Sequence, residues 1–430
     1  MITPIPTGNY AGVVYYDITP PNETLDAESD NDLIYPPISN HEPPTVAVIG
    51  VGYVGEHLVM AFAQKFRVIG YDVSVSRIAA LKQRVSSTQN VLFTCRPQDI
   101  ATAKHFLISV PTLLNPDKTI DASYLKAALN TVGRYARPGS TVVIESSVAV
   151  GMTRELLGPL SVRKGFFAGM SPERVDPGRT EPPPCDIPKI ISGLDDLAPG
   201  SLQAIRQLYS QVFNQLVSVS RPEVAEMTKL YENCQRMIGI AYANEMADAC
   251  IGHNINPFEV CNAAATKPFG YMPFTPSIGV GGHCIPVNPY YLLSNTQFPM
   301  LQAATARMSS RPSLIAERIV SQLRSHNLNG VQPRVLIVGM GFKRGQGHLS
   351  HSPGLELGKS LVLSNAVRVA WIDPLVKQEQ IPQIERLDSC YWSCEYLEES
   401  FDFIVVAVRQ EGLDFEILKQ IQGVEIQYWC

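Results

Sequence analysis

Several features that define large protein classes are absent from this 430-residue sequence. No run of about 18 apolar residues occurs, so no membrane-spanning helix is predicted. The N-terminus lacks the basic start and apolar core of a secretory signal, which makes the cytoplasm the expected location. Lysine and arginine form no basic stripe, so no nucleic-acid partner is expected.

Cysteines at metal-site or disulfide-framework spacing are also missing. The nine cysteines form an odd, scattered set without a C-x-x-C pair. Such a set is typical of reduced thiols. Cys390 and Cys394 are the only close pair, and no histidine lies near them in the sequence. No metal is therefore expected.

Residues 1–44 lack basic side chains altogether. They contain seven acidic residues and eight prolines. This composition disfavours a packed core and favours extended chain, so we expect a flexible leader.

An apolar run leads into Gly50, Gly52 and Gly55, with the G-x-G-x-x-G spacing of a strand that turns into a helix. These glycines allow a tight bend, close approach of a pyrophosphate, and close packing of helix on strand. A second expected strand, 66–71, ends at Asp72. A carboxylate there binds ribose hydroxyls and repels a 2′-phosphate. The pattern predicts a domain that binds NAD rather than NADP.

Two further expected strands end near Thr112 and Ser147. Ligands of open α/β sheets gather at the carboxyl ends of strands, so these residues should converge with Asp72. The alternative is ordinary capping of strand ends. The residues expected to contact the cofactor are Gly50, Gly52, Tyr53, Val54, Gly55, Asp72, Arg77, Pro111, Thr112 and Ser147.

Cys284 lies in a segment whose glycines and prolines, such as Gly281, Gly282 and Pro286, disfavour helix and strand. Loops on rigid scaffolds commonly carry chemistry, and an ionised thiol there can act as a covalent nucleophile. The alternative is a free cysteine in a turn.

A segment from about residue 221 to residue 252 keeps apolar residues at helical spacing, which predicts one long helix. Lys229 and Asn233 share one face of it, although a solvated surface charge is the alternative interpretation of Lys229. Residues 333–343 form a second strand that enters a glycine turn. The third glycine is missing there, so this half is predicted to bind a different nucleotide. The predicted fold class is α/β, with two Rossmann-like doubly wound domains joined by a long central helix.

Residues 45–425 resemble the nucleotide-sugar 6-dehydrogenase family, the group of UDP-glucose, UDP-N-acetylhexosamine and GDP-mannose dehydrogenases. Segments 279–287 and 171–178 are similar to the UDP-N-acetylhexosamine branch in particular. The resemblance implies that the sugar C6 hydroxyl loses a hydride to NAD and becomes an aldehyde. Cys284 then adds to the aldehyde, a second hydride transfer gives a thioester, and hydrolysis gives a uronate.

The resemblance also implies roles for individual residues. Lys229 and Asn233 stabilise oxyanion charge. Glu173 is the acid/base near the thioester, Ser147 holds water, and Lys343 contacts the nucleotide sugar. The implied catalytic residues are Cys284, Lys229, Asn233, Glu173, Asn288 and Ser147. The implied substrate-binding residues are Glu173, Arg174, Lys229, Gly281 and Lys343. The expected substrate is a UDP-sugar, either a UDP-N-acetylhexosamine or UDP-glucose. The other expected partner is a second copy of the chain, in a homodimer or higher homo-oligomer.

Two residues depart from the family pattern. Asn288 stands where the family has an aspartate that assists proton transfer, and an amide cannot accept a proton as a carboxylate does. Ser350 stands at an arginine position. Two alternatives therefore remain: an enzyme of this fold with altered chemistry or substrate, and a non-catalytic nucleotide-sugar-binding protein.

The expected domains combine these patterns with the resemblance. They are a leader (1–44), an NAD-binding domain (45–220), a central helical domain with the cysteine loop and a dimer interface (221–325), and a nucleotide-sugar-binding domain (326–430).

Overall fold

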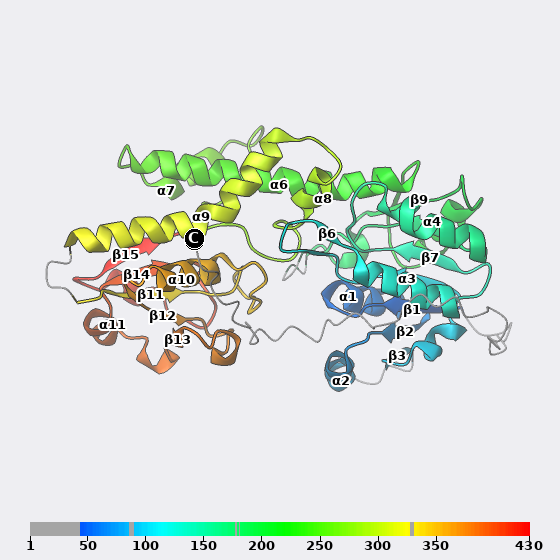
Figure 1. Ribbon diagram of the computed structural model, residues 1–430, viewed down its shortest axis with the longest axis horizontal. Helices are drawn as coiled ribbons and strands as arrows, with labels where there is room; N and C mark the ends of the chain where they lie inside the picture. The colour runs from blue at the N-terminus through cyan, green and yellow to red at the C-terminus, as the bar shows by residue number, and fades with distance from the viewer. Residues whose placement is uncertain (1–43, 86–89, 177–178, 180, 327–330) are drawn as a thin grey trace, which may run out of the picture. The chain divides into compact units, whose positions relative to one another are not determined.

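The computed structural model describes residues 44–85, 90–176, 179, 181–326 and 331–430, which form two compact units (Figure 1). The N-terminal unit comprises the described residues up to Glu232 together with Tyr290–Gln297. The C-terminal unit comprises the described residues of Asn233–Pro289 and Phe298–Cys430. All but the last residue of the predicted leader lies outside the described residues.

An eight-stranded sheet forms the centre of the N-terminal unit, in the order β10-β9-β8-β7-β4-β1-β2-β3. Its strands are β1 (Thr45–Ile49), β2 (Arg67–Tyr71), β3 (Val91–Thr94), β4 (His105–Ile108), β7 (Thr141–Ile144), β8 (Phe167–Met170), β9 (Lys189–Gly193) and β10 (Leu216–Ser218). The strands from β3 to β8 are parallel, in the spatial order of a dinucleotide-binding fold. Strand β9 pairs antiparallel with β8. A separate hairpin joins β5 (Leu113–Leu114) to β6 (Ile120–Asp121).

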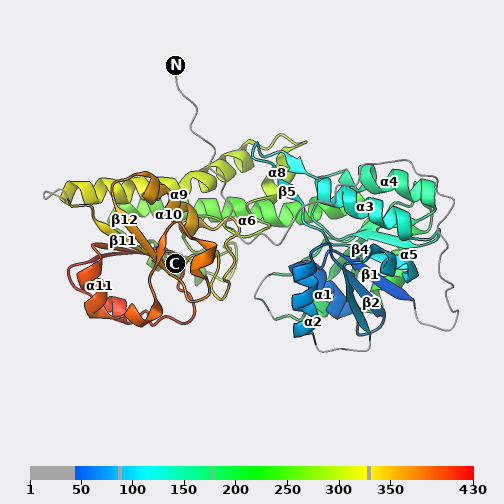
Figure 2. The ribbon, with the colours of Figure 1, turned by 60° about the horizontal axis from the view of Figure 1, so that its bottom comes forward.

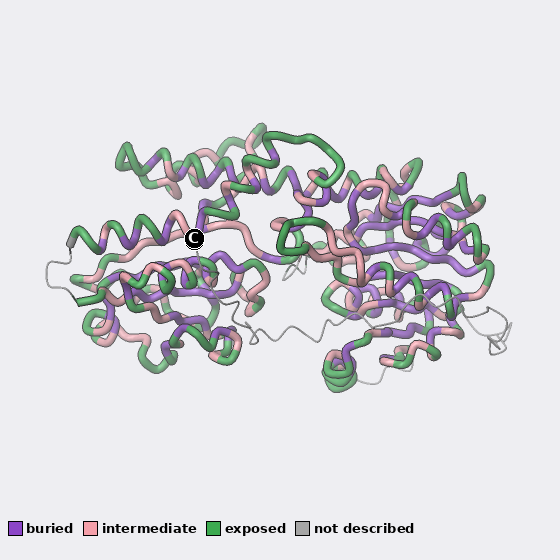
Figure 3. Tube along the Cα trace, in the orientation of Figure 1, coloured by how far each residue is buried: buried purple, intermediate pink, exposed green. Residues whose placement is uncertain are grey.

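Helices cover both faces of this sheet (Figure 2). One face packs on α3 (Ser123–Tyr135) and α4 (Met152–Lys164), and the other on α1 (Tyr53–Phe62), α2 (Val75–Arg84) and α5 (Ser201–Tyr209). Successive side chains of a strand point to opposite faces, so an inner strand must be apolar throughout. In β1, Val46 and Val48 enter one core cluster while Ala47 and Ile49 enter the other. Figure 3 shows these strands as buried.

The C-terminal unit contains a five-stranded parallel sheet in the order β13-β12-β11-β14-β15. Its strands are β11 (Arg334–Val338), β12 (Arg368–Ile372), β13 (Glu385–Arg386), β14 (Phe403–Val406) and β15 (Glu425–Tyr428). Helices α9 (Pro299–His326) and α10 (Pro353–Leu363) pack on one face. Helix α11 (Cys394–Ser400) packs on the other (Figure 1).

Helix α6 (Pro222–Ile251) begins in the N-terminal unit and continues into the C-terminal unit, as the sequence predicts. Helix α7 (Pro257–Ala265) follows it, and α8 (Asn288–Leu293) begins just after the cysteine loop. In the C-terminal unit, Asp248 of α6 accepts from the buried Arg311 guanidinium of α9, with an N–O distance of 2.8 Å. Two Rossmann-like sheets and the long shared helix confirm the predicted fold class.

Candidate active site

The glycine turn between β1 and α1 is shaped for close packing on one side and for access on the other. Gly50 has φ +87°, which favours glycine, and a Cβ on Gly55 would lie 1.8 Å from the Gly50 carbonyl oxygen. A Cβ on Gly52 would meet no atom within 4 Å. Gly52 is also the N-cap of α1 and provides no side-chain cap. This open helix N-terminus, followed by Tyr53 and Val54, fits a pyrophosphate.

Asp72 lies beside the same turn. One carboxylate oxygen accepts from the backbone N–H of Val51 and the other from that of Ser74, both at 2.9 Å. Arg77 also holds the turn, because its Nε donates to the Val51 carbonyl oxygen at 2.8 Å and its guanidinium pairs with Glu56. The carboxylate therefore stands at a fixed place next to the turn, which fits the ribose of NAD.

The structure brings Thr112 and Ser147 together after the adjacent strands β4 and β7. Thr112 Oγ1 donates to the Ser147 carbonyl oxygen at 2.7 Å. Pro111 precedes Thr112 and is exposed. Tyr291, which sequence reasoning missed, donates its hydroxyl to the Thr112 carbonyl oxygen at 2.8 Å. The expected clustering at the carboxyl ends of the strands is therefore present for this pair.

Glu173 follows β8 and is held from several sides. Its Oε1 accepts from the backbone N–H groups of Arg174 (2.7 Å) and Val175 (3.0 Å), and its Oε2 pairs with Lys189 Nζ at 2.7 Å. Burial opposes ionisation, but the charges of Lys189 and then Lys229, with the hydrogen bonds, bring the pKa of Glu173 below its ordinary value. Arg174 itself donates to Glu232 and to the Pro188 carbonyl oxygen.

The buried partner of this carboxylate, Lys189, and the residues bonded in turn to Lys189 were not found from the sequence. Lys189 also pairs with Glu145 at 2.7 Å, and the Tyr209 hydroxyl donates to the other oxygen of Glu145. Burial raises the pKa of Glu145 to about 7, against the charge of Lys189. The one available signal is that Lys189 opens an apolar, β-branched run, where a lone charge needs a buried partner.

Cys284 is exposed in the loop before α8. Its carbonyl oxygen accepts from the backbone N–H groups of Val287 (3.2 Å) and Asn288 (2.8 Å), which turns the chain into that helix. The Asn233 side-chain amide donates to the side-chain oxygen of Asn288, and both residues are buried. The structure therefore assembles Asn233, Cys284 and Asn288 in one place.

The cysteine loop packs on the loop that carries Lys343. A Cβ on Gly281 would lie 2.7 Å from Phe342 Cβ. The Gly282 N–H donates to the Ser350 carbonyl oxygen at 2.8 Å, and His283 Nε2 lies 3.0 Å from Ser350 Oγ. Ser350, at the family's arginine position, thus contacts the residue next to Cys284. Lys343 is exposed on this loop.

The second glycine turn differs from the first in how its N–H groups are used. Asp373, which is fully buried, accepts from the N–H groups of Met340 (2.8 Å) and Gly341 (2.9 Å). In the first turn, Asp72 accepts from Val51 in the equivalent place. Because Asp373 also takes the N–H of the second glycine, this turn has one fewer group for a phosphate.

The predicted site residues form two groups, one in each unit. The N-terminal unit holds Gly50, Gly52, Tyr53, Val54, Gly55, Asp72, Arg77, Pro111, Thr112, Ser147, Glu173, Arg174 and Lys229. The C-terminal unit holds Asn233, Gly281, Cys284, Asn288 and Lys343. Helix α6 carries Lys229 in the first group and Asn233, four positions later, in the second.

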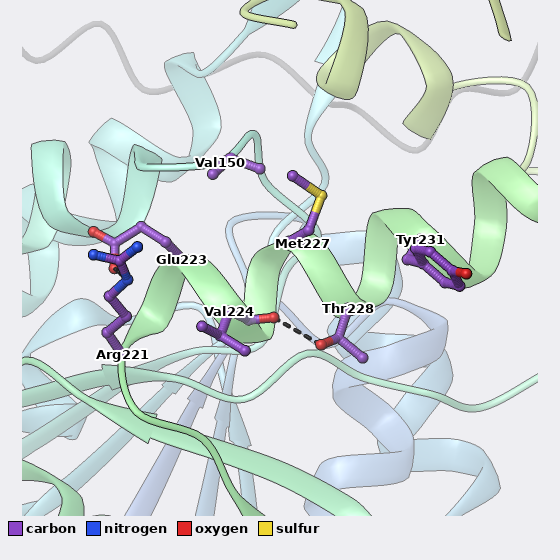
Figure 4. Close-up of a pocket in the computed structure, with 7 residues that line it drawn as sticks. All are labelled: Val150, Arg221, Glu223, Val224, Met227, Thr228 and Tyr231. Carbon is purple, nitrogen blue, oxygen red and sulfur yellow. Dashed lines mark hydrogen bonds and ion pairs between the residues drawn. The ribbon is translucent and has the colours of Figure 1, made fainter. Parts of the chain in front are cut away.

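Three further features concern only the part of the chain that the structure describes. No group of three histidine, cysteine or carboxylate side chains is arranged to hold a metal. None of the helices has the length and apolarity needed to cross a membrane. A pocket beside the first part of α6 contains none of the predicted site residues (Figure 4); it is lined by Val150, Arg221, Glu223, Val224, Met227, Thr228 and Tyr231.

Comparison with known proteins identifies the family. Residues 44–213 match the NAD binding domain of the UDP-glucose/GDP-mannose dehydrogenase family, and residues 223–309 match its central domain. UDP-N-acetyl-D-glucosamine 6-dehydrogenase of Pseudomonas aeruginosa is 32% identical over 362 residues, 78% of this chain and 83% of the relative. UDP-N-acetyl-D-mannosamine dehydrogenase of Pyrococcus horikoshii is 30% identical over 387 residues, 84% and 88% of the two chains.

A solved structure agrees with these matches. The UDP-D-ManNAc dehydrogenase structure from Pyrococcus horikoshii has a TM-score of 0.78 and 28% sequence identity, covering 90% of this chain and 95% of the other. The match to an NAD binding domain over the glycine turn confirms the predicted cofactor. The chain therefore belongs to the UDP-glucose/GDP-mannose dehydrogenase family and is an NAD-dependent dehydrogenase of nucleotide sugars.

Proposed function

We propose that this enzyme oxidises the C6 hydroxyl of a UDP-N-acetylhexosamine to the uronate in two successive hydride transfers. The observation that carries the proposal is the exposed Cys284 thiol in a loop that packs on the loop of Lys343. The relatives named for UDP-N-acetyl-D-glucosamine and UDP-N-acetyl-D-mannosamine support the substrate class.

When bound, NAD would supply the hydride acceptor, and two molecules would be used in turn: one for the hydride of the alcohol and a second for the hydride of the covalent adduct. The open face of Gly52 holds the pyrophosphate, Asp72 holds the adenosine ribose, and Thr112 with Ser147 lines the strand ends. Lys343 binds the nucleotide sugar from the C-terminal domain, 326–430, and Gly281 binds it from the cysteine loop. Arg174 supports its binding from the segment after β8.

Cys284 supplies the covalent step. Its thiolate adds to the C6 aldehyde, and the oxygen takes a proton to give the thiohemiacetal. Loss of hydride from that carbon, with loss of the hydroxyl proton, gives the thioester. Lys229 and Asn233 stabilise the oxyanion character that develops on this oxygen, which favours the transition state over the ground state.

Glu173 serves the hydrolytic step. Water bonds to the thioester carbon, its proton passes to the Glu173 carboxylate, and the C–S bond breaks to release the uronate. The Cys284 thiolate is regenerated. Ser147 holds the water. The support for this role is that Glu173 is kept ionised by Lys189, by two backbone N–H groups and by the nearby charge of Lys229.

A panel of UDP- and GDP-sugars with NAD tests the proposal, read as NADH formed per sugar consumed. The expected result is two NADH per UDP-N-acetylhexosamine with wild type. Cys284→Ala should abolish uronate formation while nucleotide-sugar binding persists. Cys390→Ala, a second exposed cysteine, is the matched control and should retain activity. Undiminished uronate formation by Cys284→Ala contradicts the covalent mechanism.

One observation favours a second candidate, an enzyme of this family that stops at the aldehyde or turns over another nucleotide sugar. The side-chain oxygen of Asn288 is bonded to Asn233, and no carboxylate stands at that position. One NADH per sugar, with aldehyde as the product, identifies this second function.

Helix α6 supports a homodimer. Val224, Met227, Tyr231, Tyr242 and Met246 are 36% to 70% exposed. At helical spacing they fall within about 100° around the axis, so they form one apolar stripe along the helix. The pocket of Figure 4 lies at its first three residues. Exposed apolar residues that gather on one face are typical of an interaction site. We propose that a second copy of the chain binds there.

A further inference from the structure

A buried ion cluster joins three neighbouring strands of the N-terminal sheet. Glu145 follows β7, Glu173 lies three residues beyond β8, and Lys189 opens β9. Strands β7, β8 and β9 are adjacent, and β9 runs antiparallel to β8. The reversal brings the start of β9 to the edge where β7 and β8 end. Lys189 therefore reaches the carboxyl-end edge from a strand that begins there.

Every charged atom of the cluster is partnered. Lys189 Nζ lies 2.7 Å from Glu145 Oε2 and 2.7 Å from Glu173 Oε2. The side chains of Lys189 and Glu145 are 3% and 0% exposed, and that of Glu173 is 12% exposed. The Tyr209 hydroxyl from α5 donates to the second oxygen of Glu145. Burying charges without partners is strongly unfavourable, so this arrangement fixes the three side chains mutually.

The cluster distributes charge unequally between its two carboxylates. Four titratable groups face Glu173: Glu145 from β7, Lys189 from β9, Tyr209 from α5 and Lys229 from α6. The neighbouring Arg174 is engaged with Glu232. The Glu173 carboxylate also accepts two backbone N–H bonds. Within the described part of the chain, the Glu145 carboxylate accepts from the side chains of Lys189 and Tyr209 and from no backbone N–H. Glu173 is thus the better-stabilised anion.

We propose that Lys189 is a positioning residue that holds the Oε2 oxygen of Glu173 and keeps this carboxylate ionised, and that Glu145 is the carboxylate of the cluster that takes up a proton. This inference rests on the proposed role of Glu173 in thioester hydrolysis. Burial raises the pKa of Glu145 to about 7. Burial also opposes ionisation of Glu173, but Lys189, the backbone hydrogen bond from Arg174 and the charge of Lys229 together lower the pKa of Glu173. Protonation of Glu145 leaves Lys189 paired to Glu173 alone, which makes Glu173 a weaker base. The hydrolytic rate therefore rises with pH through the Glu145 titration.

The location of the proton is tested without turnover. Carbon-detected NMR of enzyme labelled at the glutamate carboxyl carbons should show one buried carboxyl that titrates near pH 7. We expect that signal to vanish in Glu145→Gln and to persist in Glu173→Gln. Loss of the signal in Glu173→Gln and not in Glu145→Gln, or its absence from wild type, overturns the proposal.

The positioning role is tested by single-turnover kinetics with NAD and UDP-N-acetylglucosamine. In Lys189→Met the two carboxylates share a proton, so hydrolysis should slow by about 10²-fold or more. Acyl-enzyme on Cys284 should accumulate in mass spectra, and the pH dependence should move to higher pH. Lys189→Arg should restore the wild-type profile, and Glu145→Gln should remove the inflection near pH 7.

A merely structural role gives a different pattern. A uniform loss of NAD binding, first hydride transfer and hydrolysis in Lys189→Met, with the inflection unmoved, overturns the positioning role. If Lys189→Met does not fold, Glu145→Gln still decides through the inflection. Absence of NADH formation by wild type with every sugar contradicts the proposed function, while the NMR titration still decides the proton location.

Discussion

At the scale of single residues, we expect Asn288 to limit the turnover rate of the enzyme. Its side-chain oxygen already accepts from Asn233, so an aspartate there keeps that bond and adds a proton acceptor. Positioned proton-transfer groups typically contribute about 10²–10⁴-fold. We therefore expect Asn288→Asp to raise kcat at least several-fold, measured as NADH formation. The wild type should show a sugar adduct on Cys284 by intact mass.

Asn254→Asp, the same change on an exposed loop residue, is the control and should leave kcat unchanged. If Asn288→Asp leaves the rate unchanged or lowers it, and no adduct is seen, the amide suits the chemistry of this site. The altered-chemistry function then gains support.

We expect Asp72 to set the preference between the two nicotinamide cofactors. Its carboxylate stands beside the glycine turn, where a 2′-phosphate would meet like charge. Asp72→Ser should weaken NAD binding and narrow the advantage of NAD over NADP, measured as the ratio of kcat/KM values. Equal use of both cofactors by the wild type would show that this carboxylate does not discriminate.

Sequence reasoning works best for residues whose requirement is local. Gly50, Gly55 and Asp72 were predictable because the turn geometry depends on neighbours in the sequence. The ion pair between Lys189 and Glu145 was not predictable from the sequence. It depends on the antiparallel pairing of β9 with β8, which involves residues far apart in the sequence. A lone lysine in an apolar run indicates a buried partner without naming it.

At the scale of elements, the β1–α1 turn contains one glycine that packing requires, Gly55, and one that we expect to contact the cofactor, Gly52. A Cβ on Gly55 lies 1.8 Å from backbone, whereas a Cβ on Gly52 lies in open space. Gly55→Ala should therefore destabilise the fold by about 1–3 kcal/mol, as overpacking does. Gly52→Ala should leave the melting temperature of the enzyme without NAD unchanged and weaken NAD binding. Thermal unfolding and calorimetric titration measure both; equal loss of stability in the two variants contradicts the assignment.

Element boundaries were less predictable than element types. The strand expected to end near Thr112 ends earlier, as β4 (His105–Ile108), because the chain leaves the ladder before Pro111, which has no N–H to donate. Helix α1 begins at Tyr53, directly after the glycine turn. Helix α6 was predictable to within a residue at each end, since its apolar spacing is long and uninterrupted.

At the scale of the whole molecule, two Rossmann-like sheets were predictable because each has its own strand–turn–helix pattern. The division of the chain into two compact units falls within α6 and within α8. The local pattern of a helix does not indicate such a division. The roles of the site residues, the cytoplasmic location and the hexose stay predictions. The leader lies almost entirely outside the described residues.

The apolar stripe on α6 gives a test of assembly. We expect wild type to be a dimer by light scattering, because Tyr242 and Met246 are exposed on the same face of a 30-residue helix. The double variant Tyr242→Glu, Met246→Glu places charge in the interface, where a desolvated charge without a partner costs several kcal/mol. It should be monomeric at concentrations where wild type is dimeric. Leu363→Glu, at an apolar residue of α10 that is more exposed than either of these, should stay dimeric. A dimeric double variant would mean that another surface joins the copies.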